Sequence, residues 1–456
     1  MVGIKKPTKD GHWLPSGNPI VFTFSTTNTY TRLSYIINVY INGVLACKLK
    51  YPVYDRQRLD VDLRSVVNDF LKDDFVNDNT VSIYSELIYP KKETCSLYIE
   101  VEEEYWDGSS MVNPGVVNST KEIFIWRAAA TFQDARTVWK YEDDFTFDLN
   151  THYRADFPKF LGAKLEPFDN ANEVELVLNT TANPAFFRHC YKVSMQTVRT
   201  LSFFTYGYTN APIGSISDVF SCWCYDKDFR CTKKMEWFNP DYTNYVFSDY
   251  AKKISQFPCT PPGLNSMPWD NQTLYTGTSN NVDVREDKFY VIFSHEGNDK
   301  FGEWGIRAIP FELVPCNQYD TYDILYKTRE GGWWQIRADR KSQKSTEVKT
   351  SVKLNTWGIG ANQPVPNDWR SKEVMHTEAN GTITLNTDWL DCQAFIDEVE
   401  DMIVSPSIYL IKEGITPVYI PVLLKDTTTR IYNKNQDKLI QYSFEFEEAY
   451  KKATLI

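Results

Sequence analysis

Short apolar runs that end at turn residues recur along this chain, and the clearest pair flanks Asn42-Gly43. YIINVYI precedes this dipeptide and VLACKLKY follows it. Asn-Gly accepts the positive φ angles of a two-residue hairpin turn, so the segment predicts two paired antiparallel strands. Tyrosine and phenylalanine, which suit pleated surfaces, number 28 and 27 against 7 methionines. The chain is therefore expected to be mainly β, β-rich with a few short helices.

Residues 1–128 are expected to form an immunoglobulin-like β-sandwich. NPIVFTF precedes the hairpin, and the strand-like runs VSIYSELI, SLYIEVEEEY and EIFIW follow it. Several short strands joined by turns are typical of this sandwich. One helix is predicted within it, with Asp62 as its capping residue. Its apolar stripe has helical spacing and consists of Leu63, Val66, Val67, Phe70 and Leu71.

Residues 129–320 predict a β-rich middle domain with long loops. VELVLNT, VRTLSFFTY and KFYVIFS are strand-like. The most loop-like segment of the chain is NPDYTNYVFSDYAKKISQFPCTPPGLNSMPWDNQT. Long ordered loops are uncommon without a function, and contact with a neighbouring molecule is one such function.

Residues 321–456 predict an α+β domain in which one helix packs on an antiparallel sheet. TYDILYK and WWQIRADR flank Arg329-Glu330-Gly331-Gly332, which indicates a hairpin. GTITL, SIYLI, PVYIPVLLK, TTRIYN and LIQYSFEFEEA are further strands. A helix from Trp389 to Ile403 is predicted between them, with Asp388 as N-cap and an end before Pro406. Its apolar stripe consists of Trp389, Cys392, Phe395, Ile396, Val399, Met402 and Ile403.

The acidic residues of this helix are candidates for chemistry or for an interface. Paired catalytic carboxylates face each other across a cleft, about 5 to 9 Å apart. Here Asp397, Glu398, Glu400 and Asp401 lie opposite the apolar stripe of a single helix. They are therefore expected to form a solvated or partner-facing surface. Single histidines and the absence of GxSxG and GxxxxGK[ST] motifs favour a protein that is not an enzyme and needs no cofactor.

Nine cysteines are scattered along the chain, which favours free thiols over a disulfide framework. Their one cluster, SCWCYDKDFRC, holds Cys222, Cys224 and Cys231. Zinc sites usually need four ligands with C-x2-4-C spacing, whereas this cluster has C-x-C. We therefore expect no metal site, although the sequence leaves zinc at these three residues as a minor alternative.

Trp333-Trp334 follows two glycines and has the composition of a stacking platform for sugar rings. Adjacent residues of a strand point to opposite faces, so at most one of the two side chains is expected to face outward. Carbohydrate binding at this pair is therefore kept as an alternative function.

Charge is unevenly distributed over the last part of the chain. Asp323 to Leu354 holds eight Lys or Arg against four Asp or Glu, and Asn386 to Glu413 holds seven acids and one base. The two elements can pair within one chain or between adjacent copies, and the sequence leaves both open. Pairing between copies is a heterologous contact, which closes into a ring when its rotation allows. The basic interface candidates are Arg337, Arg340, Lys341 and Lys344.

The formal net charge of −11 argues against nucleic acid or an anionic membrane as the main partner. No segment approaches the ~18 apolar residues of a membrane span, so no membrane anchor is expected. The N-terminus MVGIKKPTKDGHW lacks the apolar core of a secretory signal, which favours synthesis in a cytosol.

Two series of motifs carry a resemblance to a known group of proteins. The first comprises NPIVFTFS, INVYINGVLACKLK and DVDLRSVVNDFL. The second comprises ILYKTREGGWWQI, ITLNTDWL, VEDMIVSPSIYLI, PVYIPVLLKD and KLIQYSFEFEEAYKK. Together they resemble virion structural proteins of tailed phages that infect Bacteroidetes, including crAss-like phages. The middle part of the chain has no such resemblance.

The resemblance implies a structural subunit of a phage tail, a virion protein assembled in the cytoplasm of the host bacterium. Such a subunit assembles as a homo-oligomeric ring, six or twelve copies being expected, at the tail hub or neck. It connects other tail and neck proteins around the DNA exit channel, through which viral DNA passes without specific binding. Two alternatives remain: a receptor-binding or adhesion protein that recognises host surface glycans, and a polysaccharide hydrolase.

Overall fold

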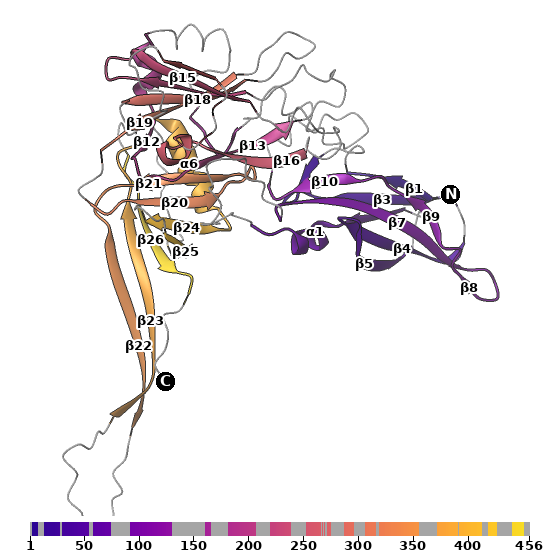
Figure 1. Ribbon diagram of the computed structural model, residues 1–456. Helices are drawn as coiled ribbons and strands as arrows, with labels where there is room; N and C mark the ends of the chain where they lie inside the picture. The colour runs from indigo at the N-terminus through magenta and orange to yellow at the C-terminus, as the bar shows by residue number, and fades with distance from the viewer. Residues whose placement is uncertain are drawn as a thin grey trace, which may run out of the picture.

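The computed structural model confirms a mainly β protein with few helices (Figure 1). It describes residues 2–7, 13–27, 30–53, 58–73, 92–129, 160–165, 181–206, 219–238, 252–265, 267, 269, 271–274, 287–295, 306–315, 319–354, 372–390, 392–412, 418–425 and 440–450. No helix in this part of the chain is long and apolar enough to cross a membrane.

Two sheets form the N-terminal sandwich. The first has the strand order β1-β3-β6, and the second has the order β2-β10-β7-β4-β5, with β8 and β9 paired to β7. Phe22 and Phe24 from the first sheet and Ile37 and Ile99 from the second are fully buried in one shared core. The strands are β1 (Val2–Lys5), β2 (Trp13–Pro15), β3 (Val21–Thr26), β4 (Thr31–Ile41), β5 (Val44–Pro52), β6 (Arg58–Asp62), β7 (Thr94–Trp106), β8 (Met111–Val112), β9 (Val116–Ser119) and β10 (Ile123–Trp126).

The hairpin and the helix predicted for the sandwich are both present. Asn42 and Gly43 have φ angles of 51° and 77°, as a turn with two left-handed residues requires. Helix α1 spans Arg64–Phe70, and its N-cap position is Leu63 rather than Asp62. The Asp62 carboxylate nevertheless accepts the backbone N–H of Arg64 at 3.0 Å. The predicted strand VSIYSELI lies outside the described residues.

The middle part of the chain contributes two further sheets, ordered β11-β13-β16 and β12-β19-β18-β14-β15-β17. Part of the segment predicted as loop, residues 239–273, instead forms β16 and α5 and contributes to β17. Phe257 in β16 is fully buried. The free energy gained by burying such a side chain favours a strand here, even though the surrounding sequence is polar. The elements are β11 (Phe160–Leu161), η2 (Pro184–Arg188), β12 (Tyr191–Val193), β13 (Thr200–Tyr206), β14 (Val219–Tyr225), β15 (Cys231–Phe238), β16 (Lys252–Pro258), α5 (Pro261–Leu264), β17 (Asn271–Leu274), β18 (Phe289–His295) and β19 (Ile306–Leu313). The predicted strand VELVLNT lies outside the described residues.

A seven-stranded antiparallel sheet forms the last part, in the order β21-β20-β24-β25-β26-β23-β22. Its outermost pair, β22 and β23, extends away from the rest of the sheet (Figure 1). The polar sequence QKSTEVKTSVKL gave no strand prediction, yet it forms β22. The strands are β20 (Tyr322–Lys327), β21 (Trp333–Ala338), β22 (Gln343–Leu354), β23 (Lys372–Asn386), β24 (Ile408–Lys412), β25 (Val418–Leu424) and β26 (Ser443–Glu448). TTRIYN lies outside the described residues.

Helix α6 (Gln393–Ile403) packs on this sheet through Ile396, Val399 and Met402, as predicted. It ends before Pro406, but its N-cap position is Cys392, so the prediction of Asp388 as N-cap is wrong. Trp389 precedes the helix and is 51% exposed, so it is not part of the packed stripe. The carboxylate of Asp388 instead accepts hydrogen bonds from Lys192 and Arg340, and these take the place of a capping hydrogen bond to the helix.

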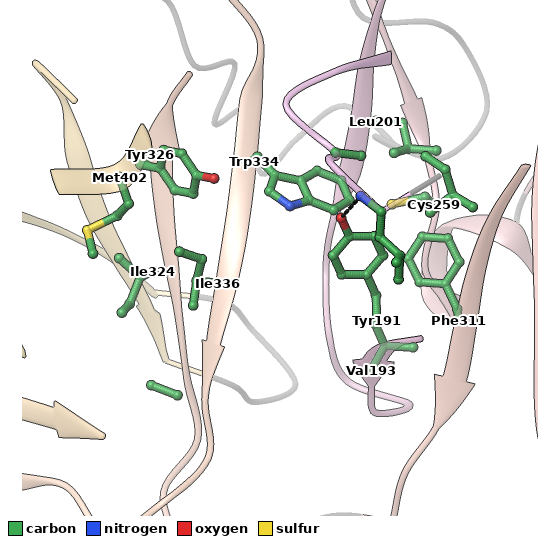
Figure 2. Packing of buried hydrophobic residues seen from close by; sticks show 14 of the residues in the cluster. Tyr191, Val193, Leu201, Cys259, Phe311, Ile324, Tyr326, Trp334, Ile336 and Met402 are labelled. Carbon is green, nitrogen blue, oxygen red and sulfur yellow. Dashed lines mark hydrogen bonds between the residues drawn. The ribbon is translucent and has the colours of Figure 1, made fainter. Parts of the chain in front are cut away.

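One hydrophobic core joins the middle and C-terminal sheets. Tyr191 and Phe311 of the middle part lie in the same cluster as Trp334 and Ile336 of β21. Figure 2 shows Trp334 beside Tyr191, with Phe311 on the far side of that ring. The rings of Tyr191 and Trp334 meet edge to face, with centroids 4.9 Å apart. The two parts therefore fold against each other rather than as separate bodies.

Truncation of Ile396 tests the packing of α6. Ile396→Ala should lower the free energy of unfolding by about 2–5 kcal/mol, because it removes buried methyl groups and leaves a cavity. Thermal unfolding followed by near-UV circular dichroism measures the change. Val404→Ala is the matched control, since Val404 is 62% exposed beside the same helix. Equal losses in the two variants would contradict this packing.

Candidate functional site

The turn between β20 and β21, Thr328–Gly332, is where the sandwich meets the rest of the chain. Trp126 donates its indole N–H to the Glu330 carbonyl at 3.0 Å, and the backbone N–H of Ala129 reaches the Arg329 carbonyl at 2.8 Å. Gly331 has φ +94°, and a Cβ there would lie 2.7 Å from the Trp126 ring. Only glycine combines this backbone angle with so close an approach.

A buried ion pair lies directly behind this turn. Lys327 Nζ lies 2.6 Å from Glu93, and the two residues are 2% and 0% exposed. The indole N–H of Trp333 donates to the same carboxylate at 2.8 Å, and Lys327 also donates to the Gly331 carbonyl at 2.7 Å. Burial lowers the pKa of Lys327, although Glu93 works in the opposite direction. This pair links the sandwich to the C-terminal sheet in a region without solvent.

On its other side the turn binds the middle part and helix α6. Lys164 contacts Glu330 at 2.5 Å and Asp401 at 3.2 Å, and Arg329 contacts Asp401 at 2.5 Å. Burial works to lower the pKa of Lys164, but the two carboxylates outweigh it and the pKa is raised. Asp401 is fully buried, and its charge is balanced by two cations. All three parts of the chain therefore contact this one turn. We call the turn and the residues that bind it the junction: Thr328–Gly332, Glu93, Trp126, Lys164, Lys327 and Asp401.

Glu398, one turn before Asp401, extends the junction into the core. Its carboxylate accepts the Tyr191 hydroxyl and the backbone N–H of Lys164, the latter at 3.1 Å. Burial raises the pKa of Glu398 to about 7, although these two hydrogen bonds work against the shift. Burial likewise raises the pKa of Tyr191 well above its ordinary value. The pair therefore remains hydrogen-bonded whether or not Glu398 carries a proton.

Arg199 is a second buried cation near Glu398. It is 2% exposed, and its guanidinium lies 5.1 Å from the Trp334 ring centre and 5.9 Å from that of Tyr191. Its Nε donates to Gln335 at 3.2 Å, and Asp323 lies 3.6 Å away. Two aromatic faces and a carboxylate thus replace the water that the guanidinium loses.

A cavity of about 140 Å³ opens beside Glu398 and Arg199. Both signs of charge lie in its wall, and some of these charges pair with each other. Asp388 binds Lys192 at 2.6 Å and Arg340 at 3.1 Å, and these cations lower its pKa to about 2 despite its partial burial. The Asp388–Lys192 pair joins the C-terminal part of the chain to the middle part at this wall. The other charged residues of the wall are Arg188, Glu312, Arg337 and Asp339.

The prediction that the four acids of α6 form an outward surface is wrong for two of them. Glu398 and Asp401 are buried, whereas Asp397 and Glu400 are partly exposed. Amphipathic spacing identified the side that packs on the sheet. It could not show that the middle part of the chain covers the helix from another direction, supplying Tyr191 and Lys164 as partners.

The prediction that at most one side chain of Trp333-Trp334 faces outward agrees with the structure, in which both side chains are buried. Trp334 packs in the core shared with the middle part, and Trp333 packs with Leu325 and Ile411 on the opposite face of the sheet. Both faces of β21 are covered, so these two rings do not form a sugar platform.

The basic candidates lie on the surface or in contact with their own chain. Arg340 pairs with Asp388, and Arg329 pairs with Asp401, so the basic and acidic elements do pair within one chain. Arg337 donates to Thr197 at 2.9 Å. Lys341 and Lys344 are exposed, and the Lys344 ammonium lies 5.6 Å from the Tyr322 ring centre.

The clustered cysteines are buried packing residues. Cys222 and Cys224 lie in the large core, and burial raises the pKa of Cys231 to about 12. Within the described residues no group of three or more His, Cys, Asp or Glu side chains could hold a metal ion. Cys316 lies outside the described residues.

The residues that build the junction were mostly not selected from the sequence. Glu93, Lys164, Tyr191 and Arg199 lie far from their partners along the chain, so no spacing pattern relates them. The glycines of the 329–332 turn are the one local signal, and by themselves they predict only a hairpin.

Comparisons with known proteins add little to this geometry. No family model matches the chain, and no curated protein matches it. Among solved structures, the full extracellular region of plexin A4 is similar over 70% of this chain, with 8% sequence identity and a TM-score of 0.17. The match spans 25% of that plexin chain.

Removal of one partner of the buried ion pair tests the junction. Lys327→Met should lower the free energy of unfolding by about 3–5 kcal/mol, because Glu93 is then buried without its cation. The double variant Glu93→Gln with Lys327→Met should recover most of this loss, since a neutral amide still accepts the Trp333 N–H. Chemical denaturation followed by tryptophan fluorescence measures both.

Lys349→Ala is the control for an exposed pair. Lys349 and Glu347 lie 3.6 Å apart with side chains 65% and 55% exposed, so about 0–1 kcal/mol is expected. A Lys327→Met loss no larger than this would show that the buried pair does not hold the parts together.

The raised pKa of Glu398 predicts a pH dependence of stability. The folded protein holds this proton up to about pH 7, whereas the unfolded chain releases it near the ordinary value of 4.5. The contribution is therefore complete below pH 4.5 and is lost as the pH rises through 7. Unfolding temperatures of the wild type should fall relative to Glu398→Gln across this window. Parallel curves for the two proteins would contradict a raised pKa.

Proposed function

We propose that this chain is a structural subunit of a phage tail, which assembles as a ring at the tail hub or neck and connects neighbouring virion proteins around the DNA exit channel. The sequence motifs of the two terminal parts suggested this class. The junction is the structural observation that supports it, because its buried charges pair with one another and fix three parts of one chain. A subunit whose parts keep one relative position suits a ring, because the same contact must repeat between every pair of copies.

Electrostatics is consistent with such a position. The net charge of −11 disfavours a tight grip on the phosphate backbone, so viral DNA would pass without specific binding. The proposed partners are copies of the same chain and other tail or neck proteins. The proposed location is the virion, after assembly in the cytoplasm of the host bacterium.

The glycan-binding alternative loses its original support, because Trp333 and Trp334 are buried. The hydrolase alternative draws its acids from separate loops of the middle part, and the buried acid in the wall of the cavity is instead Glu398 of α6. Glu398 is bound by Tyr191 and by the Lys164 backbone, which favours a role in holding the chain together.

Native mass spectrometry and two-dimensional class averages of the purified full chain test the proposal. Closed rings with cyclic symmetry, six or twelve copies, are expected. A strictly monomeric protein would contradict it. Release of reducing sugar from host capsule, lost in Glu398→Gln and retained in Asp397→Asn, would establish the hydrolase instead.

A further inference from the structure

The outermost strands of the C-terminal sheet form a two-stranded ribbon with two open edges. β22 pairs with β23 along its whole length, with one register shift between Ser351 and Val352 that leaves Met375 as an extra residue in β23. β26 pairs with β23 through Thr382–Asn386. Over Lys372–Asn380, within the described part of the chain, β23 has no second neighbour. All twelve residues of β22 are exposed. We call Gln343–Leu354 together with Lys372–Asn380 the ribbon; it projects from the body of the protein (Figure 1).

The ribbon has one apolar face, although nothing within the described chain covers it. Residues directly opposite each other share a face, and Val348 lies opposite Ala379 as Val352 lies opposite Val374. Glu347, Lys349 and Lys353 alternate with them and belong to the other face. Val348, Val352, Leu354 and Val374 are 57%, 50%, 67% and 58% exposed. Alternation of this kind is typical of strands that are half buried.

The apolar face continues the buried face of the same sheet. Ile383 and Leu385, farther along β23, are 1% exposed and lie in the core beneath α6. Ile383 lies opposite Lys344, which is four residues before Val348 and on the same side of β22. The apolar face therefore continues from the core into the ribbon, although the register shift at Met375 interrupts the alternation of β23.

The two open edges are complementary to each other. β22 carries three lysines and one glutamate, whereas Lys372–Asn380 carries one lysine and two glutamates. Copies laid side by side in the same direction place β22 of one ribbon against β23 of the next, and these strands run antiparallel. A two-fold contact between two β22 strands would instead bring two net-positive strands together, which is unfavourable.

We propose that the ribbon pairs edge to edge with the ribbons of neighbouring copies, with β22 of one copy against Lys372–Asn380 of the next, so that the ribbons close into a β-barrel on the ring axis. This inference rests on the proposed ring. A heterologous contact of this kind uses both edges of every copy and leaves none open when it closes. Neighbouring apolar faces then form one continuous band of cross-strand contacts.

Hydrogen–deuterium exchange of the assembled and dissociated full chain, with native mass spectrometry, tests the pairing. Backbone amides of β22 should exchange at least about tenfold more slowly in the ring, because strand pairing protects them. Val348→Asp with Val352→Asp should shift the population from rings to monomers. Val44→Asp with Val116→Asp is the matched control, since these valines are 69% and 52% exposed on the sandwich.

Charge reversal identifies which edges meet. Lys353 and Glu373 lie opposite each other within one ribbon, so each single reversal also places like charges opposite each other in the same chain. Lys353→Glu and Glu373→Lys should each reduce ring formation. An equal mixture restores opposite charges only between copies, and it should form mixed rings more readily than either variant. An equal mixture that forms rings no more readily than either variant alone would overturn the proposal.

The outcomes separate this inference from the proposed function. Rings whose ribbon amides exchange freely, and which survive Val348→Asp with Val352→Asp, would overturn the ribbon pairing and leave the ring subunit standing. A chain that stays monomeric at every concentration would overturn both. The unfolding temperatures of the dissociated monomers should be the same in the ribbon variants and the wild type, because the substituted side chains lie outside the core.

Discussion

The ion pair between Glu93 and Lys327 constrains the rest of the structure, because two opposite charges without solvent access are tolerable only in contact. Glu93 lies just before β7 of the sandwich, and Lys327 ends β20 of the C-terminal sheet. Their contact fixes the sandwich against the turn that follows β20. Trp126 and Gly331 then complete a contact in which neither side can shift without exposing a charge or colliding with a ring.

Helix α6 also places buried charges in contact with partners from another part of the chain, on the other side of the turn. Its apolar residues pack on the sheet, while Glu398 and Asp401 bind Tyr191, Lys164 and Arg329. Buried polar groups of this kind contribute little net stability but penalise every arrangement that separates them. They therefore specify one relative position of the parts, which is the property that a subunit of a symmetric assembly needs.

The ribbon differs from the junction in physical character. The junction satisfies its charges internally, whereas the ribbon leaves backbone edges and apolar side chains on the surface of the single chain. Natural proteins usually block such edges with prolines, bulges or covering loops, and here the open edge of β23 carries one register shift, at Met375. A rigid body that presents an open, complementary pair of edges is suited to joining copies of itself, and the proposed ring and barrel combine these two features.

The sequence alone determined several of the local elements of this protein. Asn42-Gly43 sets its hairpin because its φ angles need no help from distant residues, and the spacing of Ile396, Val399 and Met402 set the packed side of α6. Only the tertiary structure determines that Glu398, Asp401, Trp333 and Trp334 are buried. Their burial depends on segments more than a hundred residues away in the chain, such as those of Tyr191 and Glu93. The sequence did not predict β22, because its polar residues form a strand only where β23 supplies the hydrogen-bonding partner. Short-range patterns indicate the backbone preference of a segment and which face of a helix or strand is apolar. They carry no information about which distant segment packs on the opposite face.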